Sequence, residues 1–139
     1  MGSLKSTSRL KAFVRYKNTG KVIAKDVRVV FVAYPIKKGE KPDFNIIENE
    51  PSTGGSVFFL TPGEESRSYH PQAKTKPLTE LDIAQIESGD VVIYAFGKIY
   101  YRDTPECSHW TKFCTYYIPS VKRYSNYSDY NDTDEVKYP

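Results

Sequence analysis

The stretch VVIYAFGKIYYRDTPECSHWTKFCTYYI, residues 91–118, decides the fold class of this chain. Most of its residues are β-branched or aromatic, and such side chains fill the surface of a pleated sheet well. The loop at residues 104–108 contains Pro105, which has no N–H to donate to a strand ladder, so we expect the first strand to end there. The stretch therefore predicts two long antiparallel strands joined as a hairpin.

The two faces of the first strand differ in polarity, because side chains alternate along a strand. One face carries Val91, Ile93, Ala95, Gly97, Ile99, Tyr101 and Asp103. The other face carries Val92, Tyr94, Phe96, Lys98, Tyr100 and Arg102. We predict that the first, more apolar face lies on the core and that the second is a half-solvated surface.

The register of the hairpin follows if Asp103 faces His109 across the loop. This register places Ile99 beside Phe113, Tyr100 beside Lys112, and Arg102 beside Trp110. The last two are predicted cation–π pairs, each contributing about 0.5–1 kcal/mol when exposed.

Shorter strands and one helix surround the hairpin. We expect strands over residues 10–16, 26–34 (ended by Pro35), 57–60 and 66–70, with residues 44–47 forming at most a short strand. Thr79 as N-cap and Gly89 as the residue after the C-terminus predict a helix over residues 79–88. About seven strands with one short helix predict an all-β fold, an antiparallel β-sandwich of immunoglobulin or fibronectin-III type.

The length of 139 residues indicates a single domain, which we place at residues 10–118. The opening MGS is typical of a start added for expression, so we expect residues 1–9 to lie outside the domain and the native protein to extend upstream. Residues 119–139 are rich in Tyr, Ser, Asn and Asp and poor in aliphatic residues. They predict a C-terminal tail that packs along the surface or is partly disordered.

Composition argues against several classes of function. The net charge of +3 is small and mixed along the chain, which does not favour nucleic-acid binding. Cys107 and Cys114 would lie about 23 Å apart on one strand, so we expect no disulfide. Two cysteines and two histidines make a poor zinc set, and we predict neither a metal nor a cofactor.

Three short runs resemble known domains. Asn18-Thr19-Gly20 with Ala24 and Val27 resembles the N-x-G…A-x-x-V start of bacterial immunoglobulin-like domains, among them cell-adhesion-related ones, and LTPGE at residues 60–64 resembles their L-x-P-G-E turn. The run FGKIYYRD with the later H-x-T-x-F-C pattern resembles bacterial proteins that have no assigned activity and carry N-terminal membrane helices. The resemblance spans residues 10–118. It implies a membrane-anchored module on the extracytoplasmic side, in the periplasm or at the cell surface, and it transfers no catalytic residue.

Asp103 and His109 are the acid–histidine pair that the hairpin brings together. As general acid and base they would suit a small thiol or acid–base hydrolase with Cys107 as nucleophile. A Cys–His pair needs a thiol that the structure holds in place, whereas Cys107 lies on a turn. We therefore favour a structural pair that ties the ends of the hairpin together, and we predict that the chain is not an enzyme.

The solvated hairpin face supplies the predicted binding residues. These are Tyr94, Phe96, Tyr100, Arg102, Trp110, Lys112 and Tyr116. Aromatic rings beside cations can bind sugars, peptides or single-stranded nucleic acid. In the alternative that we favour, the tail or the helix covers this face and the aromatic rings are packing residues.

The leading hypothesis is a non-enzymatic interaction or structural module whose partner is a protein or a glycan and not nucleic acid. One alternative is a carbohydrate- or peptide-binding module that uses the aromatic hairpin face, and the other is the hydrolase described above. Membrane contact is expected through an upstream anchor alone. An open edge strand can pair with a second copy, so we expect a monomer or an edge-strand dimer.

Overall fold

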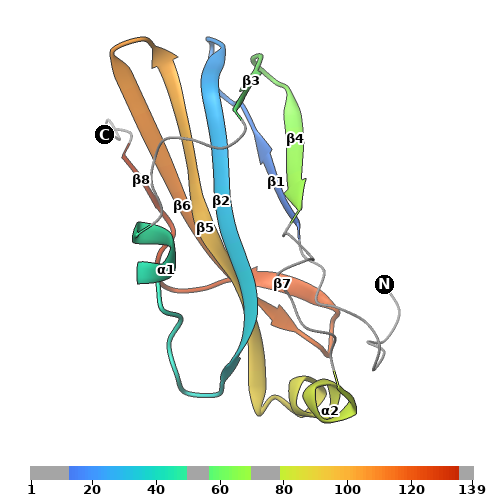
Figure 1. Ribbon diagram of the computed structural model, residues 1–139. Coiled ribbons are helices and arrows are strands. Elements are labelled where there is room, and N and C mark those ends of the chain that lie inside the picture. The colour runs from blue at the N-terminus through green and yellow to red at the C-terminus, as the bar shows by residue number, and fades with distance from the viewer. Residues whose placement is uncertain (1–12, 50–56, 70–78, 135–139) are drawn as a thin grey trace.

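Two layers of antiparallel strands form the molecule, as a computed structural model of residues 13–49, 57–69 and 79–134 shows (Figure 1). The smaller layer pairs β1 (Phe13–Lys17) with β4 (Glu65–Tyr69). The larger sheet has the order β3-β2-β5-β6-β7, with β8 also paired to β6. Its strands are β2 (Ala24–Lys37), β3 (Phe58–Leu60), β5 (Val91–Thr104), β6 (Cys107–Ile118), β7 (Arg123–Asn126) and β8 (Asp132–Thr133). The predicted all-β sandwich with a short helix is confirmed.

The hairpin of β5 and β6 exists, but its predicted register is wrong by two residues. His109 lies opposite Tyr101 instead of Asp103, Ile99 lies opposite Thr111, and Tyr100 lies opposite Trp110. The reason is a tighter turn than expected, because Thr104 already pairs with Cys107. A slide of two residues keeps every side chain on its own face of the sheet but changes each of its cross-strand neighbours.

Strand β2 continues through Pro35, which was predicted to end it. The N–H of Lys38 donates to the carbonyl of Asp90, and in an antiparallel pair such hydrogen-bonded positions recur at every second residue. Pro35 falls between these positions, so its nitrogen points away from β5. Among the described residues, β3 pairs with β2 only at Ala24 and Val27, so Pro35 lies on an edge. Proline is tolerated there because no ladder hydrogen bond is lost.

The predicted short strand at residues 44–47 is instead a single helical turn, α1 (Asn45–Glu48). The carboxylate of Asp43 accepts a hydrogen bond from the backbone N–H of Asn45, which favours a turn over an extended chain. Ile47 is fully buried against the large sheet. The apolar run was too short for its periodicity to separate a helix from a strand.

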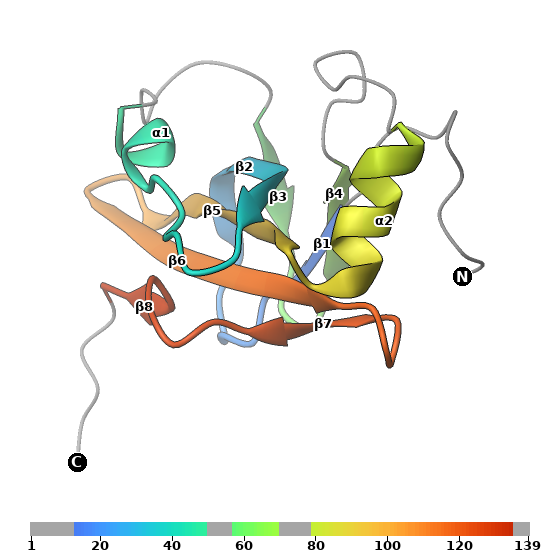
Figure 2. The same cartoon turned by 90° about the horizontal axis from the view of Figure 1, so that it is seen from below.

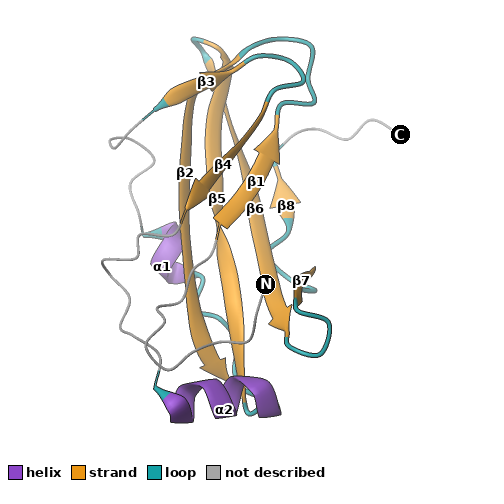
Figure 3. Cartoon of the chain, turned by 90° about the vertical axis from the view of Figure 1, so that its right-hand side faces the viewer, coloured by secondary structure: helices purple, strands orange, loops and turns teal. Residues whose placement is uncertain are grey.

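The predicted helix is confirmed as α2 (Glu80–Ser88). Thr79 and Asp82 form a reciprocal capping box at its start, and Gly89 ends it with a φ of 86°. Figure 3 shows α2 lying across one end of the sandwich. Ile86 packs there into the core of the face that β1 and β4 also cover.

The large sheet is covered on both faces (Figure 2). We call the side facing β1, β4 and α2 the inner face and the side facing α1 the outer face. The inner core consists of Phe31, Ala33, Ile86, Ile93, Ala95 and Tyr117. The outer core consists of Ile47, Phe96 and Cys114, with partly buried aromatic residues around them. The prediction that the inner face lies on the core is confirmed, whereas the prediction of a solvated outer face is wrong at its centre.

Two short strands within residues 119–134 extend the large sheet, so this part of the predicted tail packs on the domain. β7 pairs with residues 115–118 of β6, and β8 pairs with residues 111–112. Between them the side-chain amide of Asn131 accepts from the N–H of Cys114 and donates to its carbonyl, both at 3.0 Å. This side chain thus replaces a backbone acceptor for the N–H of Cys114 at the gap between the two short strands, while the carbonyl of Cys114 also accepts from the N–H of Tyr127 at 3.0 Å. The expectations for residues 1–9 and 135–139 fall outside the described residues.

Candidate functional site

The predicted binding residues gather on the outer face of the hairpin. The register pairs Tyr94 with Tyr116 and Tyr100 with Trp110, and it places Lys112 opposite Lys98. Arg102 lies at the turn, where its guanidinium donates to the carbonyl of Pro105 at 2.9 Å. The set is therefore close in space, although through neighbours other than those expected.

The centre of this face is closed. Phe96 has no exposed surface, and the rings of Phe44 and Tyr130 pack edge-on against it at 5.2 and 6.3 Å between centroids. The ring of Tyr127 packs in the same way on Tyr94 at 5.3 Å. These contacts come from the segment before α1 and from residues 127–130. The aromatic rings at the centre are packing residues and do not form an open stacking platform.

The two facing lysines of this face have an internal counter-charge. The carboxylate of Glu48 accepts hydrogen bonds from Lys98 at 2.6 Å and Lys112 at 2.9 Å, and from the hydroxyl of Tyr130 at 2.8 Å. Burial by itself would raise the pKa of Glu48, but these three donors outweigh it and lower the pKa to about 2. The acidic residue of α1 therefore neutralises both lysines of this face.

Trp110 lies half-buried beside these lysines. The ammonium groups of Lys98 and Lys112 lie 5.6 and 4.8 Å from its ring centroid. Its backbone N–H donates to the carboxylate of Asp134 at 3.1 Å. The predicted cation–π partner Arg102 is instead 3.8 Å from the carboxylate of Asp26, so this prediction is wrong because the register differs.

His109 lies between two carboxylates near the end of the hairpin. Its Nε2 is 3.0 Å from Oδ2 of Asp103, and its Nδ1 is 3.4 Å from Oδ2 of Asp134. Its ring also stacks on Tyr101 at 5.2 Å. Burial acts to lower the pKa of His109, but the hydrogen bond and charge of Asp103, together with Asp134, raise it above the ordinary value. The hydrogen bond from His109 in turn lowers the pKa of Asp103.

This arrangement suits a structural link better than an acid–base site. Both ring nitrogens of His109 face carboxylates, whereas a histidine that activates a nucleophile needs one nitrogen aimed at a thiol or hydroxyl. Cys107 is exposed at the turn, and Cys114 is a buried free thiol whose burial raises its pKa to about 12. Within the described ranges no group of three or more His, Cys, Asp or Glu side chains is arranged to hold a metal ion.

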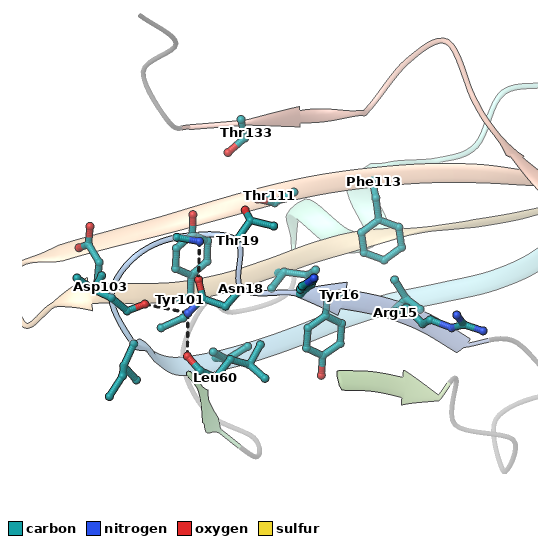
Figure 4. A pocket seen from close by; sticks show the side chains of 18 residues that line it. Arg15, Tyr16, Asn18, Thr19, Leu60, Tyr101, Asp103, Thr111, Phe113 and Thr133 are labelled. Carbon is teal, nitrogen blue, oxygen red and sulfur yellow. Dashed lines mark hydrogen bonds between the residues drawn. The ribbon is translucent and has the colours of Figure 1, made fainter. Parts of the chain in front are cut away.

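A groove lies between the two layers, at the end of the sandwich that holds the β5–β6 turn (Figure 4). Its volume is about 550 Å³. Phe113 and Thr111 point from β6 toward β1, which forms the opposite wall. Most of its exposed lining surface is apolar, although seven of the lining residues are polar, among them Asp103, Asn18 and Thr133. The apolar ones include Val14, Val22, Ile23, Val27, Leu60, Ile99 and Phe113.

Asn18 holds the rim of this groove together. Its side-chain amide donates to the carbonyls of Val22 at 2.8 Å and Leu60 at 2.9 Å, and its side-chain oxygen accepts from the N–H of Gly20 at 2.9 Å. Its backbone carbonyl accepts from Gly63 at 2.7 Å. The N-x-G and L-x-P-G-E runs that were compared with bacterial domains are thus hydrogen-bonded to each other beside the groove.

The groove was not predicted from the sequence. One signal was present, because the strand predicted at residues 10–16 is much shorter than the hairpin that it must cover. In the structure β1 has 5 residues and β5 has 14. Ile99 and Tyr101 therefore extend along the inner face beyond the reach of a full covering layer.

No protein family matches this chain, and no curated protein or solved structure matches it. The resemblance to bacterial immunoglobulin-like proteins stays a prediction. In the described ranges neither helix has the length and apolar character needed to cross a membrane.

Proposed function

We propose that this chain is a non-enzymatic interaction module of immunoglobulin-like type that binds its partner in the groove between its two layers. The groove itself is the observation that carries the proposal. Its volume of about 550 Å³ lies within the range of ligand-binding clefts, and most of its exposed surface is apolar, with polar side chains interspersed. Apolar surface left open in this way is a source of binding free energy.

The strand order supports the immunoglobulin-like part of the proposal. In such sandwiches strands B and E are neighbours in one sheet, and strands C′, C, F and G are neighbours in the other. Here β1 and β4 take the positions of B and E, and β3, β2, β5 and β6 take those of C′, C, F and G. The chain order agrees with this assignment, and α2 lies in the connection from E to F.

The groove is favoured over the two other surfaces considered. The aromatic hairpin face has Phe96 buried at its centre and Glu48 bound to its lysines, so a ligand there would have to displace internal contacts. The Asp103–His109 pair has a second carboxylate on the remaining ring nitrogen, which speaks against a hydrolase. The groove needs no such rearrangement.

The cellular position of the module rests on the resemblance alone. Anchoring to a bacterial membrane with the domain on the extracytoplasmic side stays a proposal. Protease accessibility of the native protein in intact cells tests it, and protection until the cells are lysed would contradict it.

Binding of the neutral dye Nile red to the purified chain tests the groove. Thr111→Phe places a ring in the groove and is expected to weaken saturable dye binding at least about tenfold, because the apolar contacts of the dye are lost. The matched control is Phe59→Ser, which removes a large side chain that is 63% exposed and does not line the groove. Dye binding that survives Thr111→Phe but is lost in Phe59→Ser contradicts the proposal.

A further inference from the structure

We propose that the edge of β1 at Arg15 and Lys17, which pairs with no other described strand, takes up an extended segment of a partner protein as an antiparallel strand, with apolar side chains in the groove and acidic side chains facing outward. This inference rests on the proposed function and names its partner. β-strand addition of this kind draws affinity from main-chain hydrogen bonds and specificity from pockets for alternate side chains.

The first observation is that one edge of β1 pairs with no described strand. Among the described residues β4 is the one strand that pairs with β1. The N–H of Asn18 donates to the carbonyl of Glu64 at 3.0 Å, so hydrogen-bonded pairs with β4 recur at every second residue, at Tyr16 and Val14. The N–H and C=O groups of Arg15 and Lys17 therefore point to the opposite edge.

The second observation is that the groove lies beside this edge. All residues from Val14 to Lys17 line it, and the inner-face side chains Ile99, Thr111 and Phe113 form its floor. A strand added to β1 would place every second side chain over this floor, because side chains alternate along a strand. One added segment would thus satisfy the backbone edge and fill the apolar groove together.

The third observation is the charge beside the edge. Arg15 and Lys17 are exposed and lie on the outer side of β1, where they face Arg67 and Glu65 of β4, so this side carries three cations and one carboxylate. Residues of an added antiparallel strand that face them directly have side chains on the same side, and opposite charges there are favourable. The outward positions of the partner segment are therefore acidic.

The same charges disfavour two other occupants. In a two-fold pairing that overlaps all of β1 with β1 of a second copy, Arg15 would face its own counterpart, and like charges directly opposite are destabilising. Residues 1–12 of this chain contain Lys5, Arg9 and Lys11 and no acidic residue, so they too would add like charge.

The strand order points to the same place. In the immunoglobulin scheme strand A lies next to strand B, on the side away from strand E. With β1 as B and β4 as E, the free edge of β1 is the position of strand A. A partner segment would complete the smaller layer at this position.

The test uses a fluorescently labelled peptide, EVEVEVE, whose binding to the purified chain is followed by polarisation. In antiparallel pairing the outward glutamates are the residues whose N–H groups face β1. N-methylation of the glutamates is expected to weaken binding at least about 30-fold, whereas N-methylation of the valines changes it by less than about threefold. Equal weakening by both modifications, or loss with the valine form alone, overturns the proposal.

Two further comparisons complete the test. The peptide KVKVKVK is expected to bind at least about tenfold more weakly, and the variant R15E/K17E is expected to reverse this preference. If the preference does not reverse in this variant, the role of the charges is refuted.

If no peptide binds while the chain binds Nile red and Thr111→Phe abolishes that binding, the strand proposal fails and the proposed function stands. If neither probe binds, both fail. Peptide binding that appears only after residues 1–11 are deleted shows the edge occupied by the chain itself and also overturns the proposal.

Discussion

The inner and outer faces of the large sheet are covered by different means. The inner face receives a second layer of two strands and α2, and this layer leaves a groove of about 550 Å³. The outer face receives no further strand among the described residues, but α1 and residues 127–134 close its centre with interlocking aromatic rings. Phe44 and Tyr130 stack there at 4.2 Å between centroids.

This difference shows that regular secondary structure is not needed to bury a face of the sheet completely. A strand can cover only as much of a face as its length allows, so β1, with 5 residues, leaves part of the face of β5, with 14 residues, open. Irregular segments can follow the sheet more closely, provided that their backbone groups find partners. On the outer side Asn131 supplies such partners. The groove is thus a consequence of a short second layer.

At the centre of the inner face, strands β2 and β5 approach each other very closely. A Cβ atom at Gly97 would lie 2.1 Å from the carbonyl oxygen of Val30 and 2.5 Å from Cβ of Phe31. Glycine is therefore required at this position of β5 for β2 to pack beside it. Phe31 and Phe113 lie on either side of this glycine, with ring centroids 6.3 Å apart. The groove opens beside this closely packed region, and Phe113 forms part of its floor.

The largest expected effect tests whether the outer face is a true core. Phe96→Ala removes a fully buried ring and is expected to lower the free energy of unfolding by about 3–5 kcal/mol, because it leaves a cavity among Phe44, Tyr34 and Tyr130. Urea denaturation measures it. The control Phe59→Ala, at a ring that is 63% exposed, should change stability by less than about 0.5 kcal/mol. Similar values for the two variants would restore the picture of a solvated outer face.

An intermediate effect tests the polar clamp on β6. Asn131→Ala removes the side chain that bonds both backbone groups of Cys114 and also donates to the carbonyl of Tyr127 at 2.9 Å. We expect a loss of about 1–3 kcal/mol, because the N–H of Cys114 is left without its partner. Hydrogen exchange at this amide should accelerate along with the fall in stability. The control Asn126→Ala, at the exposed end of β7, should leave the exchange of Cys114 unchanged.

The smallest effect tests the link between His109 and the C-terminal segment. The pKa of His109 is raised in the folded state, so its stabilisation is present below its unfolded pKa near 6.5 and is lost as pH rises through the folded value. The pKa of Asp103 is lowered, so its stabilisation is present above 3.8 and is lost as pH falls. The pair of His109 and Asp103 therefore contributes most to the free energy of unfolding between pH 3.8 and pH 6.5.

His109→Gln is expected to remove the decline in the free energy of unfolding on the alkaline side of pH 6.5, an effect of about 0.5–1 kcal/mol for a partly exposed ion pair. Denaturation midpoints from pH 5 to 9 measure it. Asp134→Asn keeps an oxygen for the N–H of Trp110 while removing the charge, and it should reduce the decline only in part. The substitution His70→Gln, at the other histidine of the chain, serves as the control. A decline that persists in His109→Gln and vanishes in His70→Gln would refute the link.

Local patterns predicted part of this structure well. The capping residues of α2 lie within one turn of the positions that they cap, so Thr79, Asp82 and Gly89 could be recognised directly. The alternation along β5 placed Ile93 and Ala95 on the inner core. The hairpin register failed because it depends on the geometry of one tight turn.

The site was harder to predict, because exposure depends on residues that are distant in sequence. Phe96 was assigned to a solvated face, yet Phe44 and Tyr130 bury it from more than thirty positions away in either direction. Alternation placed Lys98 and Lys112 on that face, but no local pattern indicated that Glu48 binds both. The groove involves β1, β5 and β6 together, and no local pattern encodes such a combination.

The sequence by itself determined that this chain forms long strands, where its helix begins and ends, and which side chains share a face, because these properties depend on residues a few positions apart. Only the tertiary structure decided which face is closed, which edge of β1 has no partner strand among the described residues, and where apolar surface remains open. Those properties depend on the lengths of elements that meet across the sandwich and on the segments that cover them. Burial is a property of the assembled layers, whereas alternation is a property of the strand.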